Sequence, residues 1–246
     1  MSVRSYSEVY RDVCRQSRLN GFKSGMLAGH FLTRDIGRIC SAFFIRHGVI
    51  PNVITVYMIL FGIAGSVLFA LPNVWCKFIG YFCWIMWFSM DCSDGQVARY
   101  TRHFSKYGAE MDFMAHLIDH PCMIMSIWLT FLQMKVMEPI PLSAIFLAVM
   151  AMEMIMRNIT AFNHYHSKMD SGKSAGSGPA HISSLRYVWR QVYLFPNFIV
   201  CFSWFIPLGY LLDAKWTIWV FLGWACLFVL GFIRGLFTVF SRIYPE

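Results

Sequence analysis

The chain has 246 residues, of which 57% are hydrophobic and only 14% are charged, and its formal net charge is +8 at pH 7. This composition excludes an ordinary soluble domain and indicates a membrane protein with several spanning helices. The eight cysteines form no CxxC pair and most lie in apolar runs, so we interpret them as reduced packing residues.

The first 50 residues are mixed and basic, and we expect no signal peptide among them. Over residues 30–48, apolar side chains recur at helical spacing and basic residues flank them, which predicts an amphipathic helix in the membrane interface. For residues 1–25, an interfacial helix and a solvated basic tail both remain open. We therefore separate an N-terminal cytoplasmic or interfacial segment, residues 1–50, from a membrane domain at 51–246.

Six apolar runs follow, at roughly 53–71, 74–90, 107–134, 139–163, 191–212 and 216–240. A helix needs about 20 residues to cross a membrane, so we predict an all-α integral membrane protein with about six transmembrane helices. Turn signals separate several runs, at Pro72-Asn73, Glu138-Pro139 and Asp213-Ala214-Lys215. Pro51 suits the first turn of the first span, and Asn52 or Thr55 can cap that helix.

Basic residues fall mostly on one side of these spans. With the N-terminus inside, 18 of the 21 Lys and Arg residues lie on the inner side, and only Lys77, Lys135 and Lys215 lie outside. The positive-inside rule then predicts a multi-pass protein of the cytoplasmic membrane with both termini in the cytoplasm. A basic cytoplasmic face favours anionic lipid headgroups and nucleotide phosphates, and we expect no nucleic acid as a partner.

Residues 164–190 form the longest polar connection, rich in Gly, Ser and His, on the cytoplasmic side. A flexible linker and a lid or acceptor-recognition loop are both compatible with this composition. In the last span, Gly231 and Gly235 form a G-x-x-x-G pair that suits helix packing.

Polar residues concentrate between Asp91 and His116, where two apolar runs meet. Asp91 and Asp94 are three residues apart, and Asp112 and His116 are four apart, so on helices each pair shares one face. Two helix ends would thus direct three carboxylates and an imidazole to one point. Carboxylates with open coordination positions suit hard divalent ions such as Mg²⁺, and polar groups near a membrane are costly unless they bind something.

Three neighbouring residues suit a phosphorylated ligand. Gly95 and Gly108 have no side chain, so a ligand can approach the backbone closely. Arg99 carries the planar guanidinium that matches phosphate oxygens. The stretch therefore predicts a metal site beside an anion site.

The same stretch resembles the signature of the CDP-alcohol phosphotransferases, D-x2-D-G-x2-A-R-x8-G-x3-D-x3-D. It matches at every fixed position except the last, where His116 stands in place of Asp. Members of that family transfer a phosphoalcohol from a CDP-linked donor to an alcohol acceptor and release CMP. The P-N-x-x-T sequence at 51–55 also recurs in the family, before the first span.

The resemblance implies specific roles for these residues. Asp91, Asp94, Asp112 and His116 would hold divalent ions, Mg²⁺ or Mn²⁺ and most simply two of them, which can neutralise a diphosphate and orient an acceptor hydroxyl. The residues implied to bind the CDP donor are Asn52, Thr55, Gly95, Ala98, Arg99, Ser105 and Gly108. Family members are commonly homodimers, and we expect the same here.

His116 is the departure from the family pattern. In the family the last carboxylate binds a metal and serves as base toward the acceptor hydroxyl. An imidazole is a competent base near neutral pH, although it is a poorer ligand for Mg²⁺ than for Mn²⁺ or Zn²⁺. We predict an active enzyme with His116 as base and Asp112 as a second catalytic residue. A loosely bound second metal, a single or different metal, and loss of activity remain open.

Two neighbouring side chains offer alternatives at this site. Asp119 shares a helix face with Asp112 and His116, so it either supplies the missing carboxylate or packs as a polar residue. Cys92 lies between two predicted ligands, but thiolate suits softer metals than Mg²⁺.

The resulting prediction is a membrane CDP-alcohol phosphotransferase that acts in phospholipid or lipid-linked glycan biosynthesis. Its donor alcohol and its lipid or glycan acceptor stay open. The alternative is a catalytically inactive scaffold of the same fold that retains a nucleotide and metal pocket. A cation transporter using the aspartates is a third possibility, but it leaves Gly95, Ala98, Arg99 and Gly108 without a role.

Overall fold

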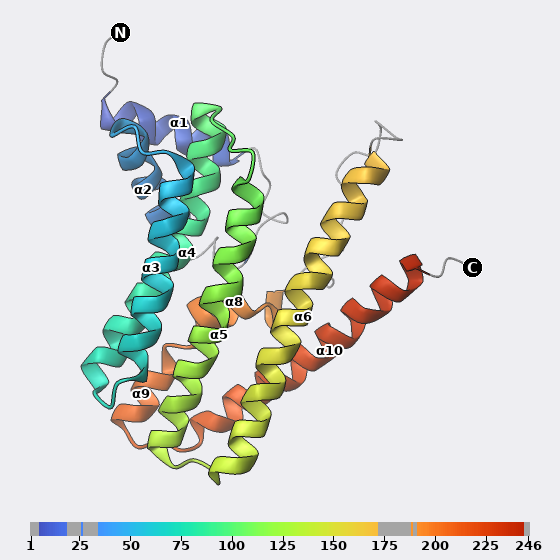
Figure 1. Ribbon diagram of the computed structural model, residues 1–246. Coiled ribbons are helices and arrows are strands. Elements are labelled where there is room, and N and C mark those ends of the chain that lie inside the picture. The colour runs from blue at the N-terminus through green and yellow to red at the C-terminus, as the bar shows by residue number, and fades with distance from the viewer. Residues whose placement is uncertain (1–4, 19–25, 27–33, 172–187, 189–190, 244–246) are drawn as a thin grey trace.

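The computed structural model describes residues 5–18, 26, 34–171, 188 and 191–243, and every regular element in those ranges is a helix (Figure 1). The predicted all-α class is therefore confirmed. The helices are α1 (Tyr6–Arg18), α2 (Arg34–Arg46), α3 (Pro51–Ala70), α4 (Val74–Thr101), α5 (Gly108–Met134), α6 (Pro139–Ser171), α8 (Phe195–Asn197), the π-helical turn η3 (Phe198–Phe202), α9 (Phe205–Leu211) and α10 (Thr217–Ile243).

Helices α3, α4 and α5 form the central bundle (Figure 1). α3 packs most extensively against α4 and next against α5. The α3–α4 contact is close because glycines meet there: a Cβ at Gly80 would lie 2.6 Å from the carbonyl oxygen of Gly65. Small residues allow helices to pack this closely in membrane proteins.

Local signals set several helix ends. Pro51 occupies the first turn of α3, as predicted. Asn73 caps α4, since its side-chain oxygen accepts hydrogen bonds from the backbone N–H groups of Trp75 at 2.9 Å and Cys76 at 3.3 Å. The prediction that Asn52 or Thr55 caps α3 is wrong: Ile50 is the capping residue, and it makes no side-chain cap bond.

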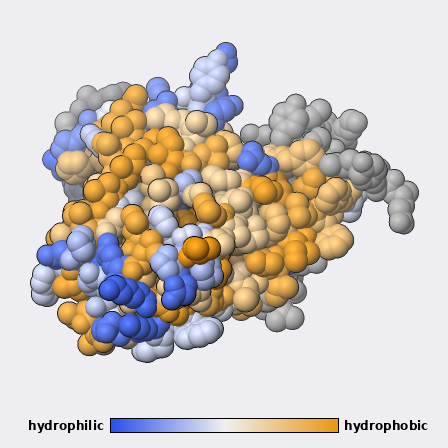
Figure 2. Space-filling view, turned by 60° about the horizontal axis from the view of Figure 1, so that its bottom comes forward, coloured by the Kyte–Doolittle hydropathy of each residue, from blue (hydrophilic) through white to orange (hydrophobic). Residues whose placement is uncertain are grey.

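Four helices among the described residues are long and apolar enough to cross a membrane. They are α3, α5, α6 as far as Phe162 and α10 as far as Ser241. α4 has 28 residues, enough to cross, but it contains Lys77 and ends in a polar segment. Hydrophobic side chains cover most of the face shown in Figure 2, as expected of a surface in contact with lipid.

The predicted span at 191–212 differs from a single helix. It consists of the short helix α8, the π-helical turn η3 and the seven-residue helix α9. Within η3, the backbone N–H of Ser203 donates to the carbonyl oxygen of Phe198, five residues earlier, at 3.0 Å. The count of about six transmembrane helices is therefore not reproduced as six long helices.

The N-terminal helices pack together beside the polar end of α4. Val9 and Val13 of α1 and Ala42 of α2 form a small buried cluster that Tyr100 of α4 adjoins. For the part of residues 1–25 that the structure describes, a packed helix replaces the solvated-tail interpretation. α2 exposes Ile39 and Phe43, so the amphipathic helix predicted for 30–48 is present, and its location in the membrane interface stays a prediction.

The polar connection predicted at 164–190 begins as a helix, because α6 continues to Ser171. Residues 172–187 and 189–190 lie outside the described residues, so the linker and lid interpretations stay untested. α6 and α10 diverge from the central bundle toward the end where α3 and α5 begin (Figure 1).

Candidate active site

Three side chains from α4 and α5 converge near the start of α5. Nε2 of His116 lies 3.4 Å from Oδ1 of Asp91 and 3.6 Å from Oδ1 of Asp112. One potential ligand atom from each residue lies within 4.8 Å of the other two. Asp112 and His116 are one turn apart on α5 and Asp91 comes from α4, so three of the four side chains that the spacing predicts to converge form one group, and Asp94 lies outside it.

Asp94 lies beside this group and is held by hydrogen bonds of its own. The hydroxyl of Thr55 on α3 donates to Oδ2 of Asp94 at 2.9 Å, and the backbone N–H of Gly95 donates to Oδ1. The hydroxyl of Thr55 thus orients a carboxylate instead of capping its own helix. Each carboxylate oxygen keeps a lone pair for a further partner.

A second polar contact ties α3 to the loop between α4 and α5. Nδ2 of Asn52 donates to the hydroxyl oxygen of Ser105 at 3.1 Å, and the backbone N–H of Tyr107 donates to the same oxygen at 3.3 Å. This contact between residues 53 positions apart in the sequence therefore holds the loop that leads into α5.

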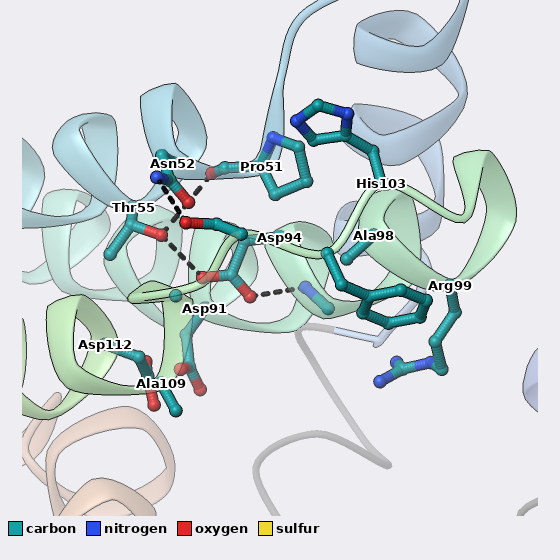
Figure 3. A pocket seen from close by; sticks show the side chains of 14 residues that line it. Pro51, Asn52, Thr55, Asp91, Asp94, Ala98, Arg99, His103, Ala109 and Asp112 are labelled. Carbon is teal, nitrogen blue, oxygen red and sulfur yellow. Dashed lines mark hydrogen bonds between the residues drawn. The ribbon is translucent and has the colours of Figure 1, made fainter.

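These residues surround one cavity of about 400 Å³ (Figure 3). Every residue that the resemblance assigns to the CDP donor lines it, together with the three aspartates. The lining residues are Pro51, Asn52, Thr55, Asp91, Asp94, Gly95, Ala98, Arg99, His103, Phe104, Ser105, Gly108, Ala109 and Asp112. His116 is absent from this lining and lies behind Asp91 and Asp112, at 7% exposure.

The lining of the cavity also contains groups that suit an anion. The first turns of α3 and α5 contribute Pro51, Asn52, Gly108 and Ala109 to its lining, and helix N-termini favour negative charge. Arg99 adds an exposed guanidinium. A Cβ at Gly95 would lie 3.0 Å from Nη1 of Arg99, so the glycine lets this guanidinium lie close to α4.

The three carboxylates lie close to one another. Among the described residues, no Lys or Arg forms an ion pair with Asp91, Asp94 or Asp112. Oδ1 of Asp112 is buried without a hydrogen-bond partner in the same part of the chain. Three close carboxylates with an open oxygen fit a hard divalent cation such as Mg²⁺ or Mn²⁺, which would neutralise their repulsion.

The next histidine along α5, His120, has a hydrogen-bond partner at each ring nitrogen, in contrast to His116. Nδ1 of His120 lies 2.7 Å from a carboxylate oxygen of Glu153, and its Nε2 lies 2.9 Å from Nη2 of Arg157. A carboxylate accepts and a guanidinium donates, so Nδ1 carries the proton and Nε2 accepts. His116 differs from His120, because its Nε2 faces two carboxylates of the site, those of Asp91 and Asp112.

The two alternatives at this site receive no support from the geometry. Asp119 is directed to Trp87, whose Nε1–H donates to its Oδ2 at 2.8 Å, and it lies outside the Asp91–Asp112–His116 group. Cys92 faces α2, where its Cβ lies 3.2 Å from the position of a Cβ at Gly37, and it does not line the cavity.

Several site residues were not identified from the sequence. His103, Phe104 and Ala109 line the cavity from the variable part of the motif, which carries no residue-type signal. Glu153 and Arg157 are an acid and a base four residues apart within an apolar run, and that spacing on a predicted span could have indicated a buried polar pair.

The family model described as CDP-alcohol phosphatidyltransferase matches residues 48–230. The matched range contains the cavity lining and His116, and it leaves out α1 and α2. No curated protein matches the chain.

Proposed function

Because this chain belongs to the CDP-alcohol phosphatidyltransferase family, we propose that it transfers a substituted phosphate group from a CDP-linked alcohol to an alcohol acceptor, with release of CMP. The observation that carries this proposal is the common cavity: Asn52 and Thr55 of α3, the motif residues of α4 and those of α5 all line it. A protein that had kept only the fold would not need these polar side chains around one space.

We assign the metal site to Asp91, Asp94 and Asp112, with His116 beside them. Mg²⁺ or Mn²⁺, with two ions as the simplest count, would supply Lewis-acid stabilisation of the diphosphate charge. The open Oδ1 of Asp112 and the absence of a protein cation among the described residues support this assignment. Thr55 orients Asp94 through its hydroxyl.

The donor would bind in the remaining part of the cavity. The N-terminal turns of α3 and α5 and the guanidinium of Arg99 are suited to its phosphate oxygens. Asn52 and Ser105 hold each other and fix the loop over this region. The side chains of the lining residues Gly95, Ala98 and Gly108 are absent or small, so the donor can approach the backbone there.

His116 would act as the base. Its Nε2 takes the proton of the acceptor hydroxyl while the acceptor oxygen forms a bond to the donor phosphorus that carries the alcohol. The anhydride bond to CMP breaks, and CMP leaves with that bonding pair. The position of Nε2 between Asp91 and Asp112 supports this role, because both carboxylates stabilise the imidazolium that forms.

We further propose that the cavity faces the cytoplasm and that the acceptor is a lipid or glycan alcohol, in phospholipid or lipid-linked glycan biosynthesis. The excess of Lys and Arg on the segments next to this cavity supports the orientation. A homodimer in the membrane belongs to the same proposal, by analogy with the family.

The second candidate function is a catalytically inactive membrane scaffold that binds nucleotide and metal. One observation favours it: a histidine occupies the last motif position and lies behind the cavity lining. A scaffold would bind CDP-linked compounds and release no CMP.

CMP release from purified protein in detergent tests the proposal. CDP-diacylglycerol, CDP-glycerol and CDP-ribitol are offered in turn with Mg²⁺ or Mn²⁺, with and without EDTA. We expect metal-dependent CMP release from one donor class, and the active donor then identifies the group transferred. Nucleotide binding without CMP release from any donor would refute the transferase and leave the scaffold.

A further inference from the structure

Within the described ranges of the chain, no hydrogen bond fixes the orientation of the His116 imidazole. Its Nδ1 is buried and has no hydrogen-bond partner in the described part of the chain. In enzymes that use a histidine base, a third group usually bonds the other ring nitrogen and orients the imidazole. Something else must hold this ring, because a misplacement of about 1 Å can lower a rate about 100-fold.

Two aromatic rings pack against His116 instead. The ring of Trp87 meets it edge to face, with centroids 5.6 Å apart and planes at 81°. The ring of His120 lies 5.1 Å away, at 73°. Trp87 and His120 are completely buried, so they form a rigid wall behind the base.

Trp87 is in turn fixed by a carboxylate that the catalytic site does not use. Its Nε1–H donates to Oδ2 of Asp119 at 2.8 Å, and Asp119 is also completely buried. The bond joins α4 to α5, three residues after His116 on the same helix. Gly62 of α3 makes room for it, since a Cβ at Gly62 would collide with the carboxyl group of Asp119.

We propose that Asp119 is a positioning residue, which acts through Trp87 to hold the ring of His116 with Nε2 toward Asp91 and Asp112. The role rests on the proposed function of His116 as base. Burying a carboxylate is costly, and an apolar side chain would fill the same space without that cost. The hydrogen bond therefore has a use beyond packing: it fixes the rotation of the indole against which His116 lies.

Four variants separate positioning from packing. Asp119→Ala removes the acceptor, and Trp87→Phe removes the donor while an aromatic ring remains. Asp119→Asn retains an oxygen that accepts from the indole, so it is the conservative rescue. Trp84→Phe is the matched control, because Trp84 lies on the same helix, is completely buried and makes no side-chain hydrogen bond within the described residues.

The first readout is the split between kcat and KM in CMP release. We expect Asp119→Ala and Trp87→Phe each to lower kcat about tenfold or more and to change KM for the CDP donor less than about twofold, because neither residue lines the cavity. Asp119→Asn and Trp84→Phe keep kcat near that of the parent protein. An unchanged kcat in Asp119→Ala, or equal losses in Trp84→Phe and Trp87→Phe, would overturn the proposal.

The second readout does not depend on activity. In protein labelled with ¹⁵N-histidine, His116→Ala identifies the imidazole signal of His116. We expect Asp119→Ala to shift or broaden that signal and Asp119→Asn to leave it in place. An unchanged signal in Asp119→Ala would overturn the positioning role. If this signal responds as expected but no CDP donor yields CMP, the proposed function fails while the positioning pair stands.

Discussion

Two polar clusters lie at opposite ends of the same three helices, α3, α4 and α5. At one end Asp91, Asp112 and His116 converge. At the other end Lys77 of α4 is completely buried, and its Nζ donates to Phe69 at 2.9 Å, Thr130 at 3.0 Å and Gln133 at 2.9 Å. The Lys77 cluster joins all three helices, and the other cluster joins α4 and α5 while Thr55 of α3 bonds to the adjacent Asp94. The two clusters therefore have similar helical surroundings.

The clusters differ in how completely their polar atoms are bonded. The ammonium of Lys77 has three N–H groups and three oxygen acceptors, and the ring of Tyr210 lies 4.4 Å away. In the other cluster, Oδ1 of Asp112 and Nδ1 of His116 have no hydrogen-bond partner within the described residues. A satisfied buried group stabilises the fold, whereas an unsatisfied one is available to a ligand. Substitutions should therefore affect activity at one end and stability at the other.

The largest expected effect on activity follows from removing one charge from the cluster of Asp91, Asp112 and His116. We expect Asp112→Asn to lower CMP release about 1,000-fold, because a metal ligand and a partner of His116 are weakened together. The thermal unfolding midpoint in detergent should stay the same or rise, since one of three close carboxylates loses its charge.

Glu110→Gln is the control for this substitution, because Glu110 is exposed two residues earlier on α5. It should leave CMP release unchanged. A large drop in the unfolding midpoint of Asp112→Asn, with activity retained, would show that the comparison between the two ends is wrong.

Lys77→Met should have the opposite effect, with lower stability and unchanged activity. It removes the lysine donor from the oxygens of Thr130 and Gln133 and one of two donors from the carbonyl oxygen of Phe69, and we expect the protein to lose about 3 kcal/mol of stability. The kcat of the molecules that remain folded should not change. Denaturation in detergent beside Lys215→Met, an exposed lysine at the same end, provides the measurement and its control. Equal stability of the two variants would contradict a structural role for Lys77.

The smallest of these effects is expected at Thr55. Thr55→Val removes the hydroxyl that donates to Asp94 while it keeps the shape of the side chain, and we expect CMP release to fall about tenfold. Ser66→Ala, farther along α3, removes a hydroxyl that donates to the carbonyl oxygen of Gly62 in its own helix, and it should have no effect. If both variants release CMP at the rate of the parent protein, the hydrogen bond from Thr55 to Asp94 is not needed for activity.

Much of the candidate site could be predicted because it depends on local spacing. Asp112 and His116 share a face of α5 by their separation of four residues, and the distances confirm this. The starts of α3 at Pro51 and of α4 after Asn73 follow from residue type alone. The roles of these residues in binding and catalysis remain proposals.

Other features depend on contacts that no local pattern encodes. The order of the apolar runs places Lys77 on the outer side of the membrane but does not predict its burial, which is set by contacts with α3, α5 and Tyr210. The bond between His120 and Glu153 depends on how α5 packs against α6. The apolar run at 191–212 shows no signal for the π-helical turn that breaks it, because hydrophobicity does not distinguish one helix from several short ones.

The most direct test of the account is the kcat of His116→Ala for CMP release, with His47→Ala, an exposed histidine after α2, as control. We predict that kcat falls about 100-fold or more, while KM for the CDP donor changes less than about twofold because His116 lies behind the cavity lining. An unchanged kcat would contradict the assignment of His116 as the base.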